Sequence, residues 1–304
     1  MSRRVLIAGG GTGGHIFPGL AVAEELARRS IEVHWLGARR GLEKELVTDR
    51  GIPLTMVEIE GMHARSPSAA LRAISQLPTA VATAVRLILH LQPEALLGVG
   101  GYASAAGVMA AGLLGLPWML QEQNSVPGWT NKVLSPWADL VCCGFSDAVA
   151  HFPSQPAIWT GNPVRDQFFR IGDLGKHDEP HLLVLGGSQG SLFLNRSIPR
   201  AIAALHERGS KVQVRHQAGK RWIEVVKTAY ADLGVQARVE AFLTEPWEAL
   251  GEADLVVARS GALTVSELAA TGRCGLLIPF AAAAGNHQEF NARSFERAGG
   301  AVVL

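Results

Sequence analysis

Residues 5–15 read VLIAGGGTGGH, a short apolar run that leads directly into a glycine-rich loop. Residues 182–190, LLVLGGSQG, repeat that arrangement in the second half of the chain. Glycine lets the backbone approach a ligand closely, and the N–H groups at the start of a following helix attract anions. Two such loops, one in each half, predict two nucleotide-fold domains that face a shared cleft.

The bulk composition fits two globular domains. The chain has 304 residues, of which 48% are hydrophobic and 18% are charged, and its formal net charge is +1. Such a chain can bury two cores, and so small a charge argues against a nucleic-acid-binding protein. The three cysteines, Cys142, Cys143 and Cys274, make a poor disulfide framework and predict a reducing compartment.

Strand-like and helix-like stretches alternate along both halves. Helices are expected at 18–29, 42–50 and 69–91, and between the later strands. The predicted strands are residues 5–8, 32–37, 54–59, 95–99, 118–122, 140–143, 182–185, 212–216, 239–242, 255–258 and 275–278. This rhythm predicts an α/β fold with parallel sheets and right-handed crossovers. The uncharged stretch 98–120 fits a buried loop and helix better than a membrane span, because glycine and proline interrupt it.

Linker-type residues separate the two halves. GNPVR at 161–165 and the polar stretch 172–180 predict an N-terminal domain at residues 1–160 and a C-terminal domain at 161–304. The last residues, 300–304, resemble the beginning of another strand, with no helix after it. The sequence therefore predicts that the C-terminal domain is incomplete at its C-terminus.

The first glycine loop fits the dinucleotide-binding fingerprint only weakly. Gly9, Gly11 and Gly14 have the required spacing. A NAD-binding domain also needs an acidic residue at the end of its second strand, where this chain has Arg39 and Arg40. An NADP-dependent dehydrogenase stays open as one alternative.

Further motifs, in a fixed order, are more specific. Residues 9–18, GGGTGGHIFP, are followed by EQN at 122–124, GNPVR at 161–165, GGSQG at 186–190, RSGALTVSE at 259–267 and NHQ at 286–288. Together they resemble the MurG family, the UDP-N-acetylglucosamine:N-acetylmuramyl-(pentapeptide) pyrophosphoryl-undecaprenol N-acetylglucosamine transferases of bacterial cell-wall synthesis. The resemblance covers almost the whole chain and implies the GT-B fold, with two Rossmann-like domains.

The resemblance implies an inverting glycosyltransferase that moves N-acetylglucosamine from UDP-N-acetylglucosamine (UDP-GlcNAc) to the 4-hydroxyl of the muramyl sugar of lipid I, giving lipid II. The implied partners are UDP-GlcNAc, lipid I, an anionic membrane surface and other cell-wall synthesis or division proteins, with no nucleic acid. The implied location is the cytoplasmic face of the bacterial inner membrane, as a peripheral protein. No cofactor or metal is expected, because the sequence contains no Asp-x-Asp motif.

Two residues are candidates for proton transfer. Histidine titrates near neutral pH, so His15 is the first choice of base, and Glu122 is the second candidate. The alternatives are that His15 only orients the acceptor and that Glu122 caps a turn. The substrate-binding set also includes Thr12, Gly13 and Gly14, whose backbone N–H groups are expected to hold the acceptor's diphosphate.

The remaining predicted contacts belong to UDP-GlcNAc. By resemblance, Ser188 and Gln189 contact the phosphates, together with Arg165. Glu267 accepts from the ribose hydroxyls, and the backbone of Leu243 bonds the uracil. The loop beneath the nucleotide and the contacts to the transferred sugar add Ala262, Leu263, Thr264, Val265, Ser266, Asn124, Gln288 and Asn291. The alternatives are a hinge salt bridge for Arg165 and a first-turn acid for Glu267.

Two departures from the family's pattern affect these assignments. Gln121 stands where the family commonly has histidine, which weakens any His–Glu relay with Glu122. Residues 281–285, AAAAG, precede the NHQ motif where the family often has an acid. No donor-sugar contact is therefore assigned to that alanine-rich stretch.

Residues 62–91 combine arginines with apolar residues, a pattern that suits an interfacial contact with anionic lipid. The predicted membrane contacts are Arg72, Ile74, Leu77, Val81 and Arg86, with Trp118 and Lys132 as candidates to join them. The alternative, that the apolar residues form domain core, stays open.

Two other function classes stay open. One is another GT-B enzyme, such as a UDP-GlcNAc epimerase, which needs no lipid-facing surface. The other is a truncated, non-catalytic form of the MurG family.

Overall fold

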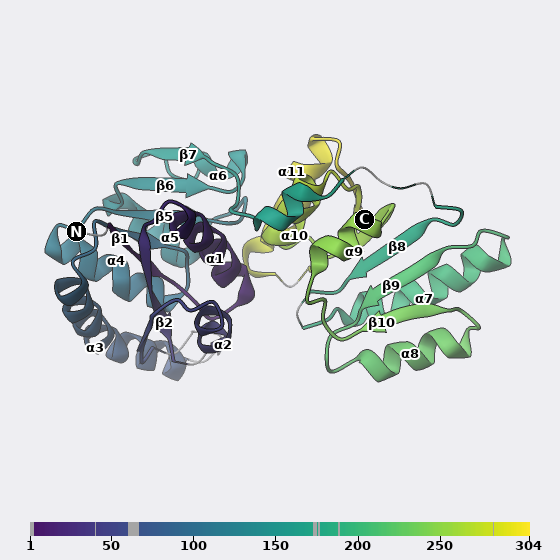
Figure 1. The fold of residues 1–304 in the computed structure, drawn as a ribbon, viewed down its shortest axis with the longest axis horizontal. Coiled ribbons are helices and arrows are strands. Elements are labelled where there is room, and N and C mark those ends of the chain that lie inside the picture. The colour runs from purple at the N-terminus through teal and green to yellow at the C-terminus, as the bar shows by residue number, and fades with distance from the viewer. Residues whose placement is uncertain are drawn as a thin grey trace. The chain divides into compact units, whose positions relative to one another are not determined.

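The chain forms two compact units, Met1–Arg165 (unit 1) and Asp166–Leu304 (unit 2). The computed structural model describes residues 3–39, 41–59, 67–172, 175, 177–187, 189–281 and 283–304, without the side chains of 67–74 and 284. Figure 1 shows each unit as a sheet with helices packed on its faces.

The boundary between the units lies five residues after the predicted one, because the GNPVR motif packs on unit 1. The side chain of Asn162 accepts a hydrogen bond from Gln121 Nε2 (2.8 Å) and donates one to the carbonyl of Gln123 (2.9 Å). The guanidinium of Arg165 lies over the ring of Phe17, 5.2 Å from its centroid. The GNPVR motif, predicted to be a linker, is thus anchored to the first sheet.

Unit 1 contains a seven-stranded parallel sheet with the strand order β3-β2-β1-β4-β5-β6-β7. The strands are β1 (Arg4–Ala8), β2 (Glu32–Ala38), β3 (Leu54–Val57), β4 (Ala95–Gly98), β5 (Trp118–Glu122), β6 (Leu140–Cys143) and β7 (Ala157–Trp159). The helices are α1 (Gly13–Arg28), α2 (Glu43–Thr48), α3 (Pro67–Leu91), α4 (Tyr102–Leu114), α5 (Trp129–Leu134), η1 (Ser135–Trp137) and α6 (Ser146–Val149).

Unit 2 contains a six-stranded parallel sheet with the strand order β10-β9-β8-β11-β12-β13. The strands are β8 (His181–Leu185), β9 (Gln213–Gln217), β10 (Ala237–Glu240), β11 (Leu255–Ala258), β12 (Gly275–Leu277) and β13 (Ala301–Val303). The helices are η2 (Asp166–Arg170), α7 (Leu192–Glu207), α8 (Ile223–Asp232), α9 (Pro246–Glu252), α10 (Ala262–Thr271), η3 (Ala284–Asn286) and α11 (His287–Arg297).

Both sheets reverse their strand order beside their first strand, as in Rossmann folds. In unit 1 the first strand, β1, lies between β2 and β4, and in unit 2 the first strand, β8, lies between β9 and β11. The two glycine loops follow β1 and β8, so each lies at the point of reversal, where open α/β sheets bind their ligands. The predicted fold, two Rossmann-like domains with parallel sheets, is confirmed.

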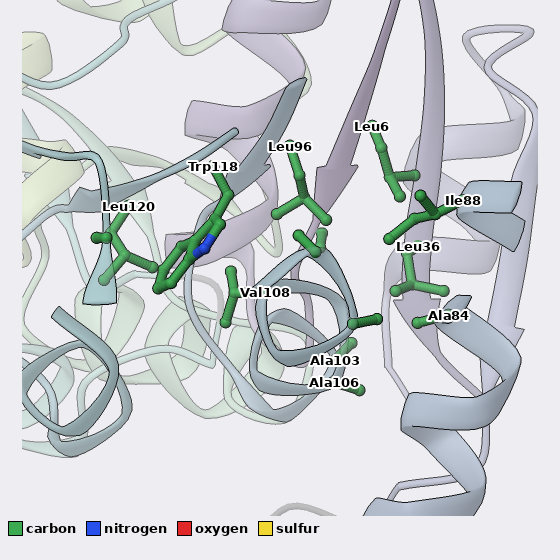
Figure 2. Packing of buried hydrophobic residues seen from close by; sticks show 14 of the residues in the cluster. Leu6, Leu36, Ala84, Ile88, Leu96, Ala103, Ala106, Val108, Trp118 and Leu120 are labelled. Carbon is green, nitrogen blue, oxygen red and sulfur yellow. The ribbon is translucent and has the colours of Figure 1, made fainter. Parts of the chain in front are cut away.

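The core of unit 1 is built around the uncharged stretch 98–120. Its small residues form α4, which packs against the sheet through buried positions such as Ala103 and Ala106. Figure 2 shows these helix residues beside Leu36, Leu96 and other strand residues. Within the described residues, no helix is both long and apolar enough to span a bilayer.

Trp118 corrects one sequence-based expectation. It was a candidate for membrane contact, but only 6% of it is exposed, and it packs in the same core, beside Leu120 in Figure 2. Burial of so large an apolar side chain stabilises the fold and leaves almost no surface for lipid.

Some elements differ from the sequence-based expectation. α1 begins at Gly13, five residues before the predicted start, so His15 lies inside the helix. α3 includes Pro78, as expected, and its Ala80, Ala84 and Ile88 face is buried in the core. β10 begins and ends two residues earlier than predicted. β7 was not predicted, since it has only three residues and carries an exposed Trp159 at the edge of the sheet.

Two glycines at the ends of α4 provide a matched test of the fold. Both have positive φ, but a Cβ at Gly101 would lie 2.4 Å from the Gly10 carbonyl oxygen, whereas a Cβ at Gly115 meets nothing within 4 Å. We expect Gly115→Ala to cost about 1 kcal/mol of unfolding free energy for left-handed backbone strain, and Gly101→Ala to cost clearly more. Urea unfolding of both variants tests this expectation, and equal losses would contradict it.

Candidate active site

The glycine loop of unit 1 is held at its base by backbone hydrogen bonds. The N–H of Gly9 donates to Leu36 O (3.0 Å), and that of Gly10 donates to Gly100 O (3.3 Å). The next N–H, of Gly11, donates to the carboxylate of Glu43 (2.9 Å). An anionic ligand therefore has to use the N–H groups of residues 12–14, at the start of α1, where no preceding helical turn can accept from them.

Glu43 is an anchoring residue that the sequence analysis did not single out. Its side chain is fully buried, and Oε1 accepts from the N–H groups of both Gly11 and Ala38 (3.1 Å). A Cβ at Gly10 or at Gly41 would fall within 2 Å of a carboxylate oxygen of Glu43. The carboxylate thus fills a space that is open only because residues 10 and 41 are glycines. In the sequence, the only hint of this role was the position of the glutamate close to glycines.

His15 lies in the first turn of α1, and its ring is oriented by the same loop. Its Nδ1 lies 3.2 Å from the carbonyl oxygen of Gly10. A carbonyl oxygen only accepts, so this contact requires a proton on Nδ1. The neutral ring therefore carries its basic lone pair on Nε2, the tautomer that a general base needs.

The loop after β4 forms the other wall beside the His15 ring. A Cβ at Gly100 would lie 2.8 Å from His15 Cδ2 and 3.1 Å from Nε2, so only glycine fits against the ring. The ring is half-buried, between exposed helix start and packed loop. Backbone packing and the Gly10 carbonyl together restrict its orientation.

Glu122 does not have the environment of a general base. Its side chain is buried, and its oxygens accept hydrogen bonds from the loop that follows β5 and from α5. Oε1 accepts from Asn124 N (2.9 Å), and Oε2 accepts from Gly128 N (3.1 Å) and Asn131 Nδ2 (2.8 Å). This geometry favours the turn-capping interpretation over the predicted role in proton transfer.

Gln121 and Asn124 belong to the same scaffold. Gln121 is buried and bonded to Asn162 and Gln123. Asn124 donates from its side chain to Glu122 Oε1 (3.3 Å). The amide of Gln121 therefore connects β5 to the GNPVR motif. The last residue of that motif, Arg165, belongs to unit 1 and lies over the ring of Phe17 in α1.

The glycine loop of unit 2 is closed in a similar way. Gly186 N donates to Gln217 O (3.3 Å), and Gly190 N donates to Gly187 O (3.0 Å). Ser191 then caps α7, with its Oγ accepting from Leu194 N. Gln189 is exposed on this loop, whereas Ser188 lies outside the described residues.

The RSGALTVSE motif begins at the carboxyl end of β11 and continues into α10. Ala262 and Val265 are buried, so of these two only the backbone is available to a ligand. The intervening Leu263 and Thr264 are half-buried, as are Ser266, whose Oγ donates to Ala262 O, and Glu267 in the second turn. Leu243, in the loop after β10, is also buried and likewise presents only backbone.

Asn291 differs from its predicted role. It is fully buried, and its Nδ2 donates to the carbonyl of Ser260 (3.3 Å). Ser260 Oγ in turn donates to Gln288 O (2.8 Å), and Gln288 Oε1 accepts from Phe280 N (3.0 Å). Asn291 therefore positions the loop after β11 and has no surface for a sugar hydroxyl, while Gln288 is half-buried at the start of α11.

A buried hydrogen-bond chain supports the glycine loop of unit 2. His216 Nδ1 lies 2.9 Å from the Tyr230 hydroxyl, and Nε2 lies 3.1 Å from Asn195 Oδ1. Asn195 Nδ2 donates to the carbonyl of Ala218 (3.0 Å), which abuts Gly190. Burial lowers the pKa of His216 from 6.5 to about 4, so the imidazole is neutral at pH 7.

No group of three or more His, Cys, Asp or Glu side chains is arranged to hold a metal ion within the part of the chain that the structure describes. The polar groups at both glycine loops are instead backbone N–H groups, amides, hydroxyls and arginine, which are donors suited to anionic ligands.

Comparison with known proteins defines the class of the chain. The glycosyltransferase family 28 N-terminal domain matches residues 5–143, and the family 28 C-terminal domain matches residues 181–304. The chain therefore belongs to glycosyltransferase family 28 and is a glycosyltransferase. This assignment excludes the alternative that the chain is an NADP-dependent dehydrogenase.

Within that class the chain is a member of the MurG family, as its motifs indicated. It is 43% identical over 308 residues to the UDP-N-acetylglucosamine--N-acetylmuramyl-(pentapeptide) pyrophosphoryl-undecaprenol N-acetylglucosamine transferase of Ectopseudomonas mendocina (strain ymp), covering 100% of this chain and 85% of that relative. The crystal structure of Acinetobacter baumannii MurG matches with a TM-score of 0.80 at 33% identity, over 99% of this chain and 86% of that one.

The fold is also shared with the UDP-GlcNAc 2-epimerase from Neisseria meningitidis, whose structure was solved with UDP-GlcNAc bound. That match has a TM-score of 0.63 at 14% identity, over 91% of this chain and 82% of that one. At so low an identity the likeness concerns the fold alone, and the epimerase alternative is not favoured.

The His216 chain predicts an acid-sensitive unit 2. The folded pKa lies below the unfolded value, so the contribution of neutral His216 is complete above pH 6.5 and is lost as the pH falls toward 4. From pH 7 to pH 5 we expect wild type to lose about 2 kcal/mol more unfolding free energy than His216→Gln, which cannot titrate. Urea unfolding at the two pH values measures this difference, and parallel losses in both proteins would argue against it.

Proposed function

We propose that this chain transfers N-acetylglucosamine from UDP-GlcNAc to the 4-hydroxyl of the muramyl sugar of lipid I, giving lipid II with inversion at the anomeric carbon. Likeness to MurG relatives over the whole of this chain supports the reaction. The observation that carries the catalytic assignment is the contact between His15 Nδ1 and the Gly10 carbonyl, which makes Nε2 the basic nitrogen.

We assign the acceptor to unit 1. The N–H groups of Thr12, Gly13 and Gly14 bind its diphosphate, because the earlier N–H groups of the loop are already bonded within the protein. His15 Nε2 takes the proton of the acceptor hydroxyl while the oxygen attacks the anomeric carbon from the face opposite UDP. A single displacement of this kind inverts the centre and needs no protein nucleophile.

We assign the donor to unit 2. Gln189, the start of α7 and the backbone of α10's first turn bind the nucleotide diphosphate, and Glu267 accepts from the ribose hydroxyls. The positive end of the α7 dipole favours the charge that UDP gains as it leaves. Arg165, being anchored to unit 1 beside His15's helix, is reassigned to the acceptor's phosphates.

An apolar groove on unit 1 is the proposed membrane contact. It has a volume of about 720 Å³ and lies between α3 and α4. It is lined by Leu77, Pro78, Val81, Ala82, Val85, Arg86, Met109 and Leu113. One face of α3 is buried in the core, while the residues that line the groove are only partly buried or exposed, so core packing is compatible with the proposed membrane contact. The side chains of Arg72 and Ile74 lie outside those described.

The function is tested with labelled UDP-GlcNAc in the presence and absence of a lipid I analogue. Transfer of label only when the lipid acceptor is present supports the proposal. Conversion of the sugar nucleotide without acceptor indicates an epimerase instead. Binding of UDP-GlcNAc with no turnover under either condition indicates a non-catalytic form.

Removal of the proposed base gives a specific prediction. We expect His15→Ala to lower the transfer rate by about 10²- to 10⁴-fold, the usual contribution of a general base, with UDP affinity unchanged. The matched control is His151→Ala, an exposed histidine of the same unit. A His15→Ala enzyme that keeps its maximal rate but needs more lipid acceptor would assign the residue to binding.

The groove gives a second prediction. Leu113 is 73% exposed on the groove, so Leu113→Glu leaves the core intact while placing a charge against lipid. We expect it to weaken binding to vesicles containing anionic phosphatidylglycerol by about tenfold or more, as burial of one leucine side chain implies. Leu233→Glu, on an exposed leucine of unit 2, is the control. Equal vesicle binding by both variants in co-sedimentation would place the contact elsewhere.

A further inference from the structure

Three hydrogen bonds hold the side chain of Arg259 beside the glycine loop of unit 2. It follows β11 directly, and its Nε donates to Ser191 Oγ, the cap of α7 (2.9 Å). Its Nη1 donates to the carbonyl oxygens of Ile278 (3.0 Å) and Pro279 (2.9 Å), after β12. One guanidinium thus connects the loops that follow three neighbouring strands of the sheet.

Two aromatic rings flank the same guanidinium. The centroids of Phe193 and Phe280 each lie 5.6 Å from Arg259 Cζ. Both rings are about half exposed, so they cover the cation from the sides without closing the site. Such cation–π contacts restrict a long side chain to one position without neutralising its charge.

The charge of Arg259 has no acidic partner within the described part of the chain. Among the residues that the structure describes, no carboxylate lies within ion-pair distance of the guanidinium, and Nη2 has no hydrogen-bond acceptor. Burial lowers the pKa of Arg259, but a guanidinium remains protonated at neutral pH. A half-buried, immobilised cation without a counter-ion is costly unless an anion arrives from outside.

The position of Arg259 indicates where an anion would bind. Ser191, which Arg259 holds, caps the sixteen-residue α7 immediately after the glycine loop 186–190. The positive end of that helix dipole and the guanidinium therefore lie at the same loop. Sequence reasoning gave Arg259 no role of its own and assigned the phosphate contacts to Ser188, Gln189 and Arg165. Of these, Arg165 belongs to unit 1.

We propose that Arg259 binds the diphosphate of the sugar-nucleotide donor and stabilises the charge of the departing UDP. The inference rests on the proposed function. When the bond between the anomeric carbon and the β-phosphate oxygen breaks, its electron pair stays on that oxygen. The acceptor oxygen forms the new bond, and its proton goes to the base. Arg259 meets the developing negative charge with a donor that is already oriented, which avoids reorganisation during the reaction.

The test compares ligands that differ only in their phosphates. Binding of UDP, UMP and uridine is measured by calorimetry on wild type, Arg259→Met and Arg259→Lys. We expect Arg259→Met to weaken UDP binding by about 10- to 100-fold, as expected for a hydrogen bond to a charged group, and to leave uridine binding within about twofold. Arg259→Lys restores part of the UDP affinity, because it keeps the charge but loses the fork. Arg238→Met, an exposed arginine on β10, is the control and binds all three ligands as wild type does.

Two outcomes overturn the inference. Equal weakening of UDP and uridine binding would mean that Arg259 only holds the loops together, and unchanged UDP binding would mean that it does not touch the phosphates. Retained uridine binding shows that a variant is folded. Failure of the proposed function is distinguished by the wild type, which would then bind UDP, with the Arg259 dependence intact, and transfer no label to lipid I.

Discussion

In both units, the structure depends on a place where two backbone loops meet with no side chain between them. In unit 1, Gly101 lies so close to the Gly10 carbonyl that a Cβ would come within 2.4 Å of its oxygen, and in unit 2 Gly190 lies against the Ala218 carbonyl at 2.0 Å on the same measure. Each contact lies at the reversal point of a sheet. It holds together the loops that follow two neighbouring strands, at the edge of the sheet where open α/β folds bind their ligands.

Around these contacts, buried polar side chains hold the loops through hydrogen bonds to backbone groups. Glu43 and Glu122 use their carboxylates to accept backbone N–H groups, and Asn195 and Asn291 hold carbonyls of the donor side. Burial of such groups is costly unless they are hydrogen-bonded, so each one fixes the loop that satisfies it. His15 differs from these residues, since it is only half-buried and its Nδ1 lies against the Gly10 carbonyl, which directs the proposed base function to Nε2.

Strong local patterns were predictable, and weak ones were not. The glycine loops, the buried α4 and the parallel sheets follow from spacing and composition, because glycine punctuation and apolar runs report directly on backbone geometry. β7 escaped prediction because three residues carry no period. The start of α1 was predicted five residues too late, because Gly13 and Gly14 look like loop residues although they form the first turn of the helix. The domain boundary moved because a side-chain network, which no local pattern reveals, ties Asn162 to β5.

The sequence by itself determined the fold class and the family, since these depend on motifs that are contiguous along the chain. Tertiary structure decided what each polar residue does. Glu122, a candidate base, holds a loop through hydrogen bonds, and Asn291, a predicted sugar contact, is buried and supports the loop after β11. Arg259, which had no predicted role, is a cation held in one position by hydrogen bonds. The physical reason is that burial and hydrogen-bond partners come from residues distant in sequence, and these determine whether a side chain can reach a ligand.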